Sequence, residues 1–229
     1  MVAPASRFLM ITGVGPGIGK STLAEGLADR ARELGQDLDL FGEEQIFTRP
    51  AFAEIGRAFR ERRDGVRVYP DAAMLLEGYR RVLAGLGDAV LVFDWTCLAM
   101  ISDLPWAEGR PDVLLAHARD VLDLTAPLRP VIVNLKSDVE IAVARAAAQR
   151  GEDWVRRMAH LAAMSGATAR TRLGAISERI RGLPFESLEL DAFVAAGWPI
   201  WEVDAAQPAT AVLDEVARRL WSAREENRA

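Results

Sequence analysis

The feature that most constrains the fold is a glycine-rich segment between an apolar run and an amphipathic pattern. The segment reads Gly13-Val14-Gly15-Pro16-Gly17-Ile18-Gly19-Lys20-Ser21-Thr22. Phe8–Thr12 before it is a short apolar run, and Leu23, Leu27 and Leu34 behind it share one helical face that stops at Gly35. The sequence therefore predicts a buried strand, a tight loop and a helix in direct succession.

Such a loop is suited to binding a polyphosphate. Its glycines let backbone N–H groups turn inward around phosphate oxygens, and the helix N-terminus adds favourable partial charge. Lys20 can reach the β- and γ-phosphates, and the Ser21 hydroxyl can bind Mg²⁺. We therefore expect ATP or GTP with Mg²⁺ as cofactor. The expected nucleotide-binding residues of the loop are Gly15, Pro16, Gly17, Ile18, Gly19, Lys20, Ser21 and Thr22.

Two details bear on this interpretation. The usual spacing of such loops has a glycine five residues before Gly19, where this chain has Val14, with Gly13 one residue further out. We interpret the segment as a variant loop because its other glycines keep the backbone permissive. Lys20 and Lys136 are the only lysines among 28 Lys and Arg residues. In a chain that otherwise uses arginine, a lysine at position 20 indicates a chemical requirement.

Composition limits the other possibilities. The 229 residues carry a formal net charge of −5, which argues against a nucleic-acid partner, since phosphate backbones require a basic face. No apolar run approaches the ~18 residues that a membrane span needs, so no membrane partner is expected. The single cysteine, Cys97, cannot form an intrachain disulfide, and a reducing, cytoplasmic setting is expected.

The order of apolar runs predicts an α/β fold in one domain, residues 1–229. Five short runs each precede a helical pattern: Phe8–Thr12, Leu38–Phe41, Ala89–Phe93, Val131–Leu135 and Pro199–Val203. They are short and uniformly apolar, which is typical of buried parallel strands. We expect a five-stranded parallel sheet with helices on both faces. Ser137-Asp138-Val139-Glu140 has the form of a capping box, opening a helix that ends at Gly151.

Acidic residues follow two of the predicted strands. Asp94 directly follows the third run, and Glu43 and Glu44 follow the second. Ligands of open parallel sheets bind beyond the carboxyl ends of the strands, so these acids are expected near the glycine loop. Phosphoryl transfer needs Mg²⁺ on the phosphates and a base that orients the attacking hydroxyl. We expect Asp94 and Ser21 to hold the metal, and either Glu43 or Glu44 to act as the base.

Together these residues resemble the P-loop nucleoside and nucleotide kinase superfamily. Its members include deoxynucleoside kinases, thymidylate kinases and antibiotic phosphotransferases of the chloramphenicol and capuramycin type. The element order resembles the family over nearly the whole chain, although only the glycine loop is specific. Asp94-Trp95-Thr96 stands where the family usually has an Asp/Glu-Arg-Ser-like triplet, and Trp95 in place of arginine is a departure.

The resemblance implies a lid and an acceptor pocket. The family's lid follows the fourth strand and supplies arginines to the phosphates, which assigns the helix-rich, Arg-dense residues 145–181 to a lid, with Arg145 and Arg150 on the donor. Regions corresponding to Arg49 and Trp95 form the acceptor pocket in the family, so both are expected to bind substrate together with Glu44.

Two functions are compatible with the sequence. The first is a kinase that moves the γ-phosphoryl group to a hydroxyl of a small molecule, for which a nucleoside or a nucleoside-type antibiotic in self-resistance is a candidate acceptor. The other is a regulatory P-loop NTPase whose nucleotide state switches partner binding. A kinase needs an acceptor pocket and an arginine lid, whereas a switch needs loops that sense the γ-phosphate. The arginines between Arg145 and Arg157 favour the kinase.

Overall fold

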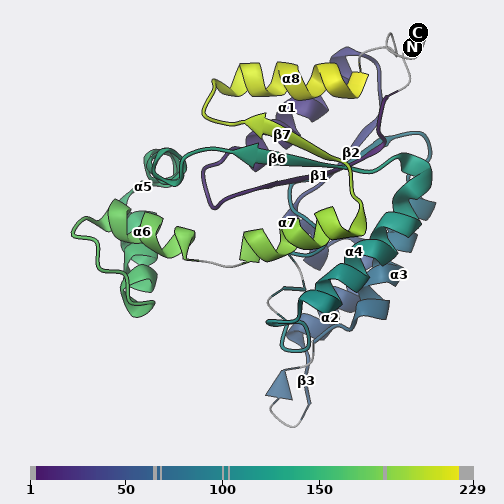
Figure 1. The fold of residues 1–229 in the computed structure, drawn as a ribbon. Coiled ribbons are helices and arrows are strands. Elements are labelled where there is room, and N and C mark those ends of the chain that lie inside the picture. The colour runs from purple at the N-terminus through teal and green to yellow at the C-terminus, as the bar shows by residue number, and fades with distance from the viewer. Residues whose placement is uncertain are drawn as a thin grey trace.

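The computed structural model describes residues 4–63, 66–67, 69–99, 101–102, 104–182 and 185–221. Within these residues, five strands form one all-parallel sheet in the order β2-β5-β1-β6-β7 (Figure 1). The strands are β1 (Phe8–Gly13), β2 (Leu38–Phe41), β5 (Val90–Phe93), β6 (Val131–Lys136) and β7 (Ile200–Asp204). All five predicted strands are present, with ends shifted by one residue at most. Two short strands, β3 (Arg62–Arg63) and β4 (Val66–Arg67), pair separately.

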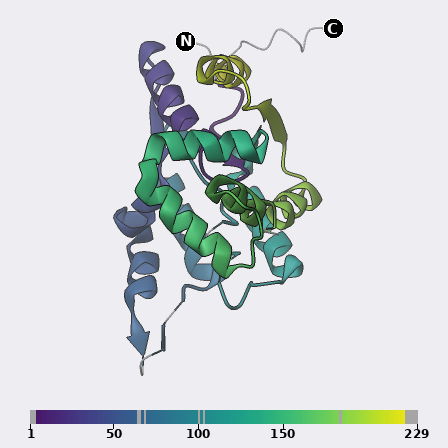
Figure 2. The same ribbon diagram turned by 90° about the vertical axis from the view of Figure 1, so that its left-hand side faces the viewer.

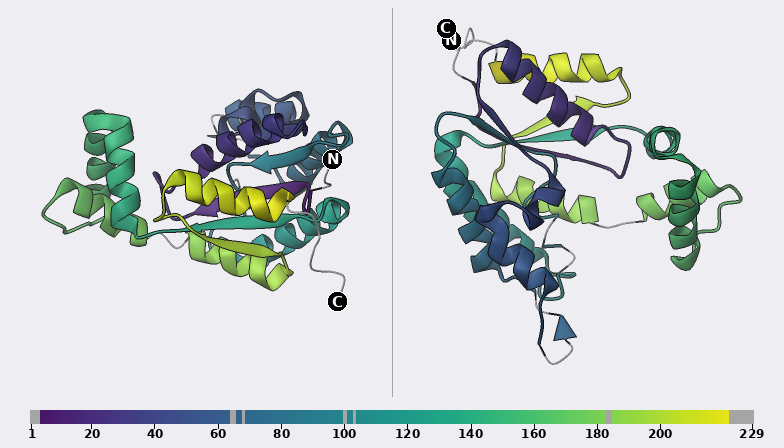
Figure 3. Two further views of the ribbon diagram at one scale, coloured as in Figure 1. Left: turned by 90° about the horizontal axis from the view of Figure 1, so that it is seen from above. Right: turned by 180° about the vertical axis from the view of Figure 1, so that it is seen from behind.

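Helices cover both faces of the sheet. They are α1 (Lys20–Glu33), α2 (Ala53–Arg60), α3 (Ala72–Ala84), α4 (Pro111–Thr125), α5 (Val139–Met164), α6 (Arg172–Arg181), α7 (Phe185–Ala196) and α8 (Ala209–Trp221), with 3-10 turns at Glu43–Phe47, Pro50–Phe52 and Ala126–Leu128. Helices α1 and α8 lie on one face, and α2, α3, α4 and α7 lie on the other (Figures 1 and 3). In the described part of the chain, no helix combines the length and the apolarity that crossing a bilayer requires.

The two cores explain why the central strands are mostly apolar. Alternate residues of β1 point to opposite faces, as in any strand. Phe8 and Met10 pack with the α3 and α4 side, and Leu9 and Ile11 pack with α1 and α8. Both sets are buried, so no position of β1 alternates to water. Leu34, expected on the buried face of the first helix, instead lies just after α1 and is 47% exposed.

Strand order places a crevice beside β1. The chain leaves β1 through α1 and reaches β2 on one side, and it leaves β6 through α5, α6 and α7 to reach β7 on the other. β1 and β6 are neighbours in register from Leu9 opposite Val131 to Gly13 opposite Leu135. Connections that diverge from adjacent parallel strands open a crevice at their carboxyl ends, where ligands of open α/β sheets bind.

Helices α5 and α6 stand beyond the carboxyl ends of the strands (Figures 1 and 2). They pack on each other around a small core of their own: Val143, Ala146, Trp154, Val155, Ile176 and Ile180. The expected start of α5 was wrong by one residue, whereas its expected end coincides with a break in the helix. Asp138, not Ser137, caps the helix, accepting from the Glu140 amide at 2.8 Å. At Gly151 the backbone is not helical, with φ 78° and ψ −177°, so the first helical segment ends there as expected, and a second segment continues α5 to Met164 beyond the kink.

Candidate active site

The glycine loop joins β1 to α1 at the crevice and is packed against the α5–α6 pair. Gly17 has φ 81°, and a Cβ at this position would lie 2.2 Å from the carbonyl oxygen of Ala142 and 2.8 Å from the amide nitrogen of Ala146. A Cβ on Gly15, at φ 76°, would lie 3.1 Å from Ile180. Close approach of α5 and α6 therefore requires glycine in the loop, in addition to the left-handed backbone.

Lys20 spans the loop from its position at the start of α1. Its Nζ lies 3.4 Å from the carbonyl oxygen of Gly13 and 3.5 Å from that of Gly15. Gly19 precedes it at φ 105°, so the loop turns directly into the helix. The first helical N–H groups, which have no partner within a helix, consequently open towards the crevice together with the lysine ammonium.

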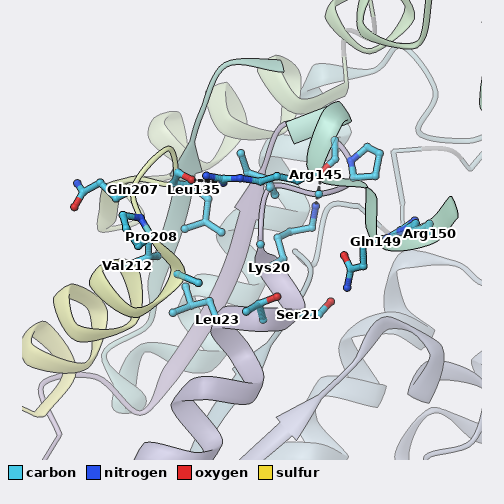
Figure 4. Close-up of a pocket in the computed structure, with 18 residues that line it drawn as sticks. Lys20, Ser21, Leu23, Leu135, Arg145, Gln149, Arg150, Gln207, Pro208 and Val212 are labelled. Carbon is cyan, nitrogen blue, oxygen red and sulfur yellow. Dashed lines mark hydrogen bonds between the residues drawn. The ribbon is translucent and has the colours of Figure 1, made fainter. Parts of the chain in front are cut away.

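One cavity, of about 400 Å³, lies over the loop and the N-terminus of α1. Figure 4 shows Lys20 and Ser21 near its centre, with Gln149 and Arg150 on one side and Gln207 and Pro208 on the other. The expected loop residues Gly15, Pro16, Gly17, Ile18, Gly19, Lys20, Ser21 and Thr22 all line it. The cavity is therefore built from the loop, the first turns of α5 and the segment after β7.

Arg145 and Arg150 both line this first cavity, but they are held differently. Arg145 donates to the carbonyl oxygens of Ala205 at 2.6 Å and Ala206 at 3.0 Å, which fastens α5 to the segment after β7. The Arg150 guanidinium lies 5.7 Å from the Trp154 ring centroid, a cation–π contact. Arg150 is exposed, so it can turn towards a ligand at little cost.

Asp94 sits at the carboxyl end of β5, beside the loop. One carboxylate oxygen accepts from the Ser21 hydroxyl at 3.2 Å, and the other accepts from the Glu43 amide at 3.0 Å. Burial raises the pKa of Asp94, while these two hydrogen bonds and the Lys20 charge act in the opposite direction. A hydroxyl and a carboxylate in contact are an oxygen pair of the kind that Mg²⁺ takes when phosphates supply further ligands.

The chain's own metal ligands do not form a complete site. In the residues that the structure describes, no group of three or more His, Cys, Asp or Glu side chains could hold a metal ion. Ser21 and Asp94 fit the protein share of a magnesium–nucleotide site, in which the polyphosphate and water provide the remaining oxygens.

A second and larger cavity, of about 1190 Å³, opens on the other side of Lys20. It shares Gly15, Pro16 and Lys20 with the first cavity. Its walls come from the 3-10 turn after β2, the segment after β5, and helices α5, α6 and α7. Two cavities that meet at one lysine can hold two ligands end to end.

The two candidate bases differ in position. Glu43 lines the second cavity, and its amide is bonded to Asp94. Glu44 lines neither cavity, and its carboxylate folds back over Gly42. Both residues lie in a 3-10 turn rather than on a strand, and only Glu43 lines a cavity, although the pKa of Asp94, raised mainly by burial, is also raised by the nearby Glu44 charge. The geometry separates two residues that the sequence left equivalent.

The two expected substrate-binding residues also differ. Trp95 is 4% exposed, lines the second cavity, and stacks on Phe93 with ring centroids 5.0 Å apart. Arg49 lines neither cavity. Its guanidinium pairs with Asp39, donates to the Leu40 carbonyl at 3.1 Å and lies over the Phe41 ring at 4.4 Å. Arg49 thus fastens the turn after β2 to that strand and does not reach the crevice.

Several residues of the second cavity were not expected from the sequence. Glu189 on α7 is 7% exposed and accepts from the hydroxyls of Thr96 at 2.8 Å and Ser102 at 3.0 Å. Arg179 and Arg181 of α6 flank Ile180, which packs on Gly15, and they line the same cavity. The density of arginine in residues 145–181 was a signal for the α6 pair, but nothing in the sequence distinguished Glu189 from other helical acids.

Comparison with known proteins adds little to this geometry. No protein-family model matches the chain. No curated protein matches it either. Among solved structures it is similar to the unliganded crystal structure of a sugar kinase from Janibacter sp., with a TM-score of 0.42 and 16% sequence identity over 94% of each chain. A similarity this distant carries no functional argument.

Proposed function

We propose that the chain is a Mg²⁺-dependent phosphotransferase that moves the γ-phosphoryl group of ATP or GTP to a hydroxyl group of a small molecule. The observation that carries this proposal is the pair of cavities that meet at Lys20, with the Ser21–Asp94 oxygens beside them. A donor polyphosphate in the first cavity would present its terminal group to an acceptor in the second.

The donor side is assigned to the loop and α5. Backbone N–H groups of the glycine loop and the ammonium of Lys20 hold the phosphates, and the nucleoside lies against the wall that Arg145 and the segment after β7 form together. Because Arg145 is bonded to Ala205 and Ala206, its role is to position that segment. Arg150 is the α5 arginine able to turn towards the phosphates. Mg²⁺, held by Ser21 and Asp94, would neutralise charge on the donor phosphates when bound.

The acceptor side is assigned to the second cavity. Glu43 faces it next to Asp94, so Glu43 is the base that orients the attacking hydroxyl and accepts its proton. Arg179 and Arg181 enter from α6, where positive charge can stabilise the transferring group. Trp95, Phe47, Phe59 and Tyr69 also line the cavity, and an aromatic wall suits a planar or sugar-bearing acceptor such as a nucleoside or a nucleoside-type antibiotic. A regulatory NTPase has no need of this second cavity.

Nucleotide binding tests the assignment of the loop. Calorimetric titration of the wild-type chain with AMP-PNP or GMP-PNP in the presence of Mg²⁺ should show one nucleotide-binding site. The same titration of Lys20→Ala should show a large loss of nucleotide affinity. Lys136→Ala is the matched control. Lys136 is the other lysine; it lies at the end of β6, pairs with Glu202 and lines neither cavity. Equal affinities in the two variants would remove the loop from the donor site.

A further inference from the structure

The second cavity contains a buried polar group that phosphoryl transfer itself does not require. Glu189 projects from α7 and bonds to the hydroxyls of Thr96 and Ser102, in the segment after β5. All three side chains are buried, and all three line the cavity. A carboxyl group is costly to bury, and a hydrophobic residue could close the interface between α7 and this segment at lower cost.

A second observation comes from the neighbouring tryptophan. The indole nitrogen of Trp95 is buried, and it has no hydrogen-bond partner within the described part of the chain. Trp95 lines the same cavity and is adjacent in sequence to Thr96. Buried tryptophan nitrogens normally have a partner, so an unsatisfied one beside a cavity indicates a place for a ligand. The cavity thus has a buried carboxyl acceptor in its wall, and the lining residue next to Thr96 carries an unpaired indole donor.

We propose that Glu189 is a specificity-determining residue of the acceptor site, supported by Thr96 and Ser102 and assisted by the Trp95 N–H. This inference rests on the proposed function, because it takes the second cavity to be the acceptor site. The acceptor then carries, besides the reacting hydroxyl, an O–H or N–H group that donates to Glu189. Sites built around a buried hydrogen-bonding group reject analogues that lack the matching group, because the protein group is then left unpaired.

The test uses matched probes that differ by one donor group. The probes come from a library of hydroxylated compounds sorted into such pairs. In this library, glucosamine and glucose are each compared with 2-deoxyglucose, and uridine is compared with N3-methyluridine. Binding is measured by thermal shift and by tryptophan fluorescence in the presence of Mg²⁺ and AMP-PNP. The variants are Glu189→Gln, which keeps the shape, and Asp191→Asn, which removes a carboxylate from the exposed side of the same helix.

We expect a donor-bearing probe to bind the wild-type chain and to lose roughly 10-fold in affinity in Glu189→Gln, with its donor-lacking partner changed less than about 2-fold. Asp191→Asn should behave as wild type. Where transfer is detected, KM for the donor-bearing acceptor should rise while kcat changes little. Ser102→Ala should give a smaller loss in the same direction, which keeps the test valid if Glu189→Gln folds poorly.

Three results would overturn the inference. The first is an equal loss of affinity in Glu189→Gln for both members of every pair, and the second is an unchanged affinity in Glu189→Gln. The third is no binding of any donor-bearing probe to the wild-type chain. Equal losses with a lowered melting temperature would assign Glu189 to holding α7 in place. Failure of the proposed function is recognised separately, as the absence of AMP-PNP and GMP-PNP binding in the wild-type chain, whatever the probes do.

Discussion

Replacing Gly17 by alanine tests whether the loop is held against α5 as the structure shows. Two costs add at this position. Alanine at φ 81° is strained by roughly 1–2 kcal/mol. Its Cβ would also lie 2.2 Å from the carbonyl oxygen of Ala142, so the loop or α5 must move apart. Overpacking of this kind typically costs about 1–3 kcal/mol, which gives a total of roughly 2–5 kcal/mol.

Gly35→Ala is the matched control. Gly35 also has positive φ, 64°, but a Cβ there would meet nothing within 4 Å. Both substitutions reduce the entropy of the unfolded chain equally, so the difference between them isolates the contact with α5. Urea unfolding should show Gly17→Ala less stable than Gly35→Ala by about 1–3 kcal/mol, with weaker AMP-PNP binding in Gly17→Ala alone. Equal free energies of unfolding would refute the close approach of the loop to α5.

Three further predictions follow from the described geometry. Burial lowers the pKa of His117 to about 4. The free energy of unfolding, measured with urea, should therefore be highest above pH ~6.5 and should fall by ~3 kcal/mol as the pH is lowered towards 4. His117→Leu should flatten this pH dependence. Glu43→Gln should lower kcat by roughly 10²–10⁴-fold at saturating metal and acceptor, whereas Glu44→Gln should change it little; the opposite order would move the base to Glu44. Hydrogen exchange of residues 145–165 should slow on adding AMP-PNP and Mg²⁺ if α5 is part of a lid, and identical exchange would count against one.

The sheet could be predicted because its central strands, β1, β5 and β6, are buried on both faces. Uniformly apolar runs such as Val90–Phe93 have few alternatives to a parallel strand between two helical layers. The loop could be predicted because glycine, lysine and serine have separate, spacing-dependent tasks there. Helix ends were less predictable. Ser137 and Asp138 can both cap a helix, and although the break at Gly151 was predictable, the second helical segment beyond it packs against α6, a contact that local sequence does not encode.

The acceptor side depended on tertiary structure. Whether Glu43 or Glu44 faces the cavity is set by the 3-10 turn after β2, and Arg49 turns away because Asp39 is within reach. Glu189 approaches Thr96 only because α7 packs beside α4 under the sheet, although the two residues are 93 positions apart in sequence. Contacts of such separation have no local pattern, so periodicity and motif spacing cannot reveal them.

The central claim is that the two cavities hold a phosphoryl donor and an acceptor. The most direct test is ³¹P NMR of ATP or GTP with Mg²⁺, the wild-type chain and the library of hydroxylated compounds. We predict a new phosphate-ester resonance with at least one compound, dependent on Mg²⁺, lost in Lys20→Ala and retained in Lys136→Ala. Release of inorganic phosphate alone, at a rate that no acceptor changes, would contradict the account and favour a regulatory NTPase.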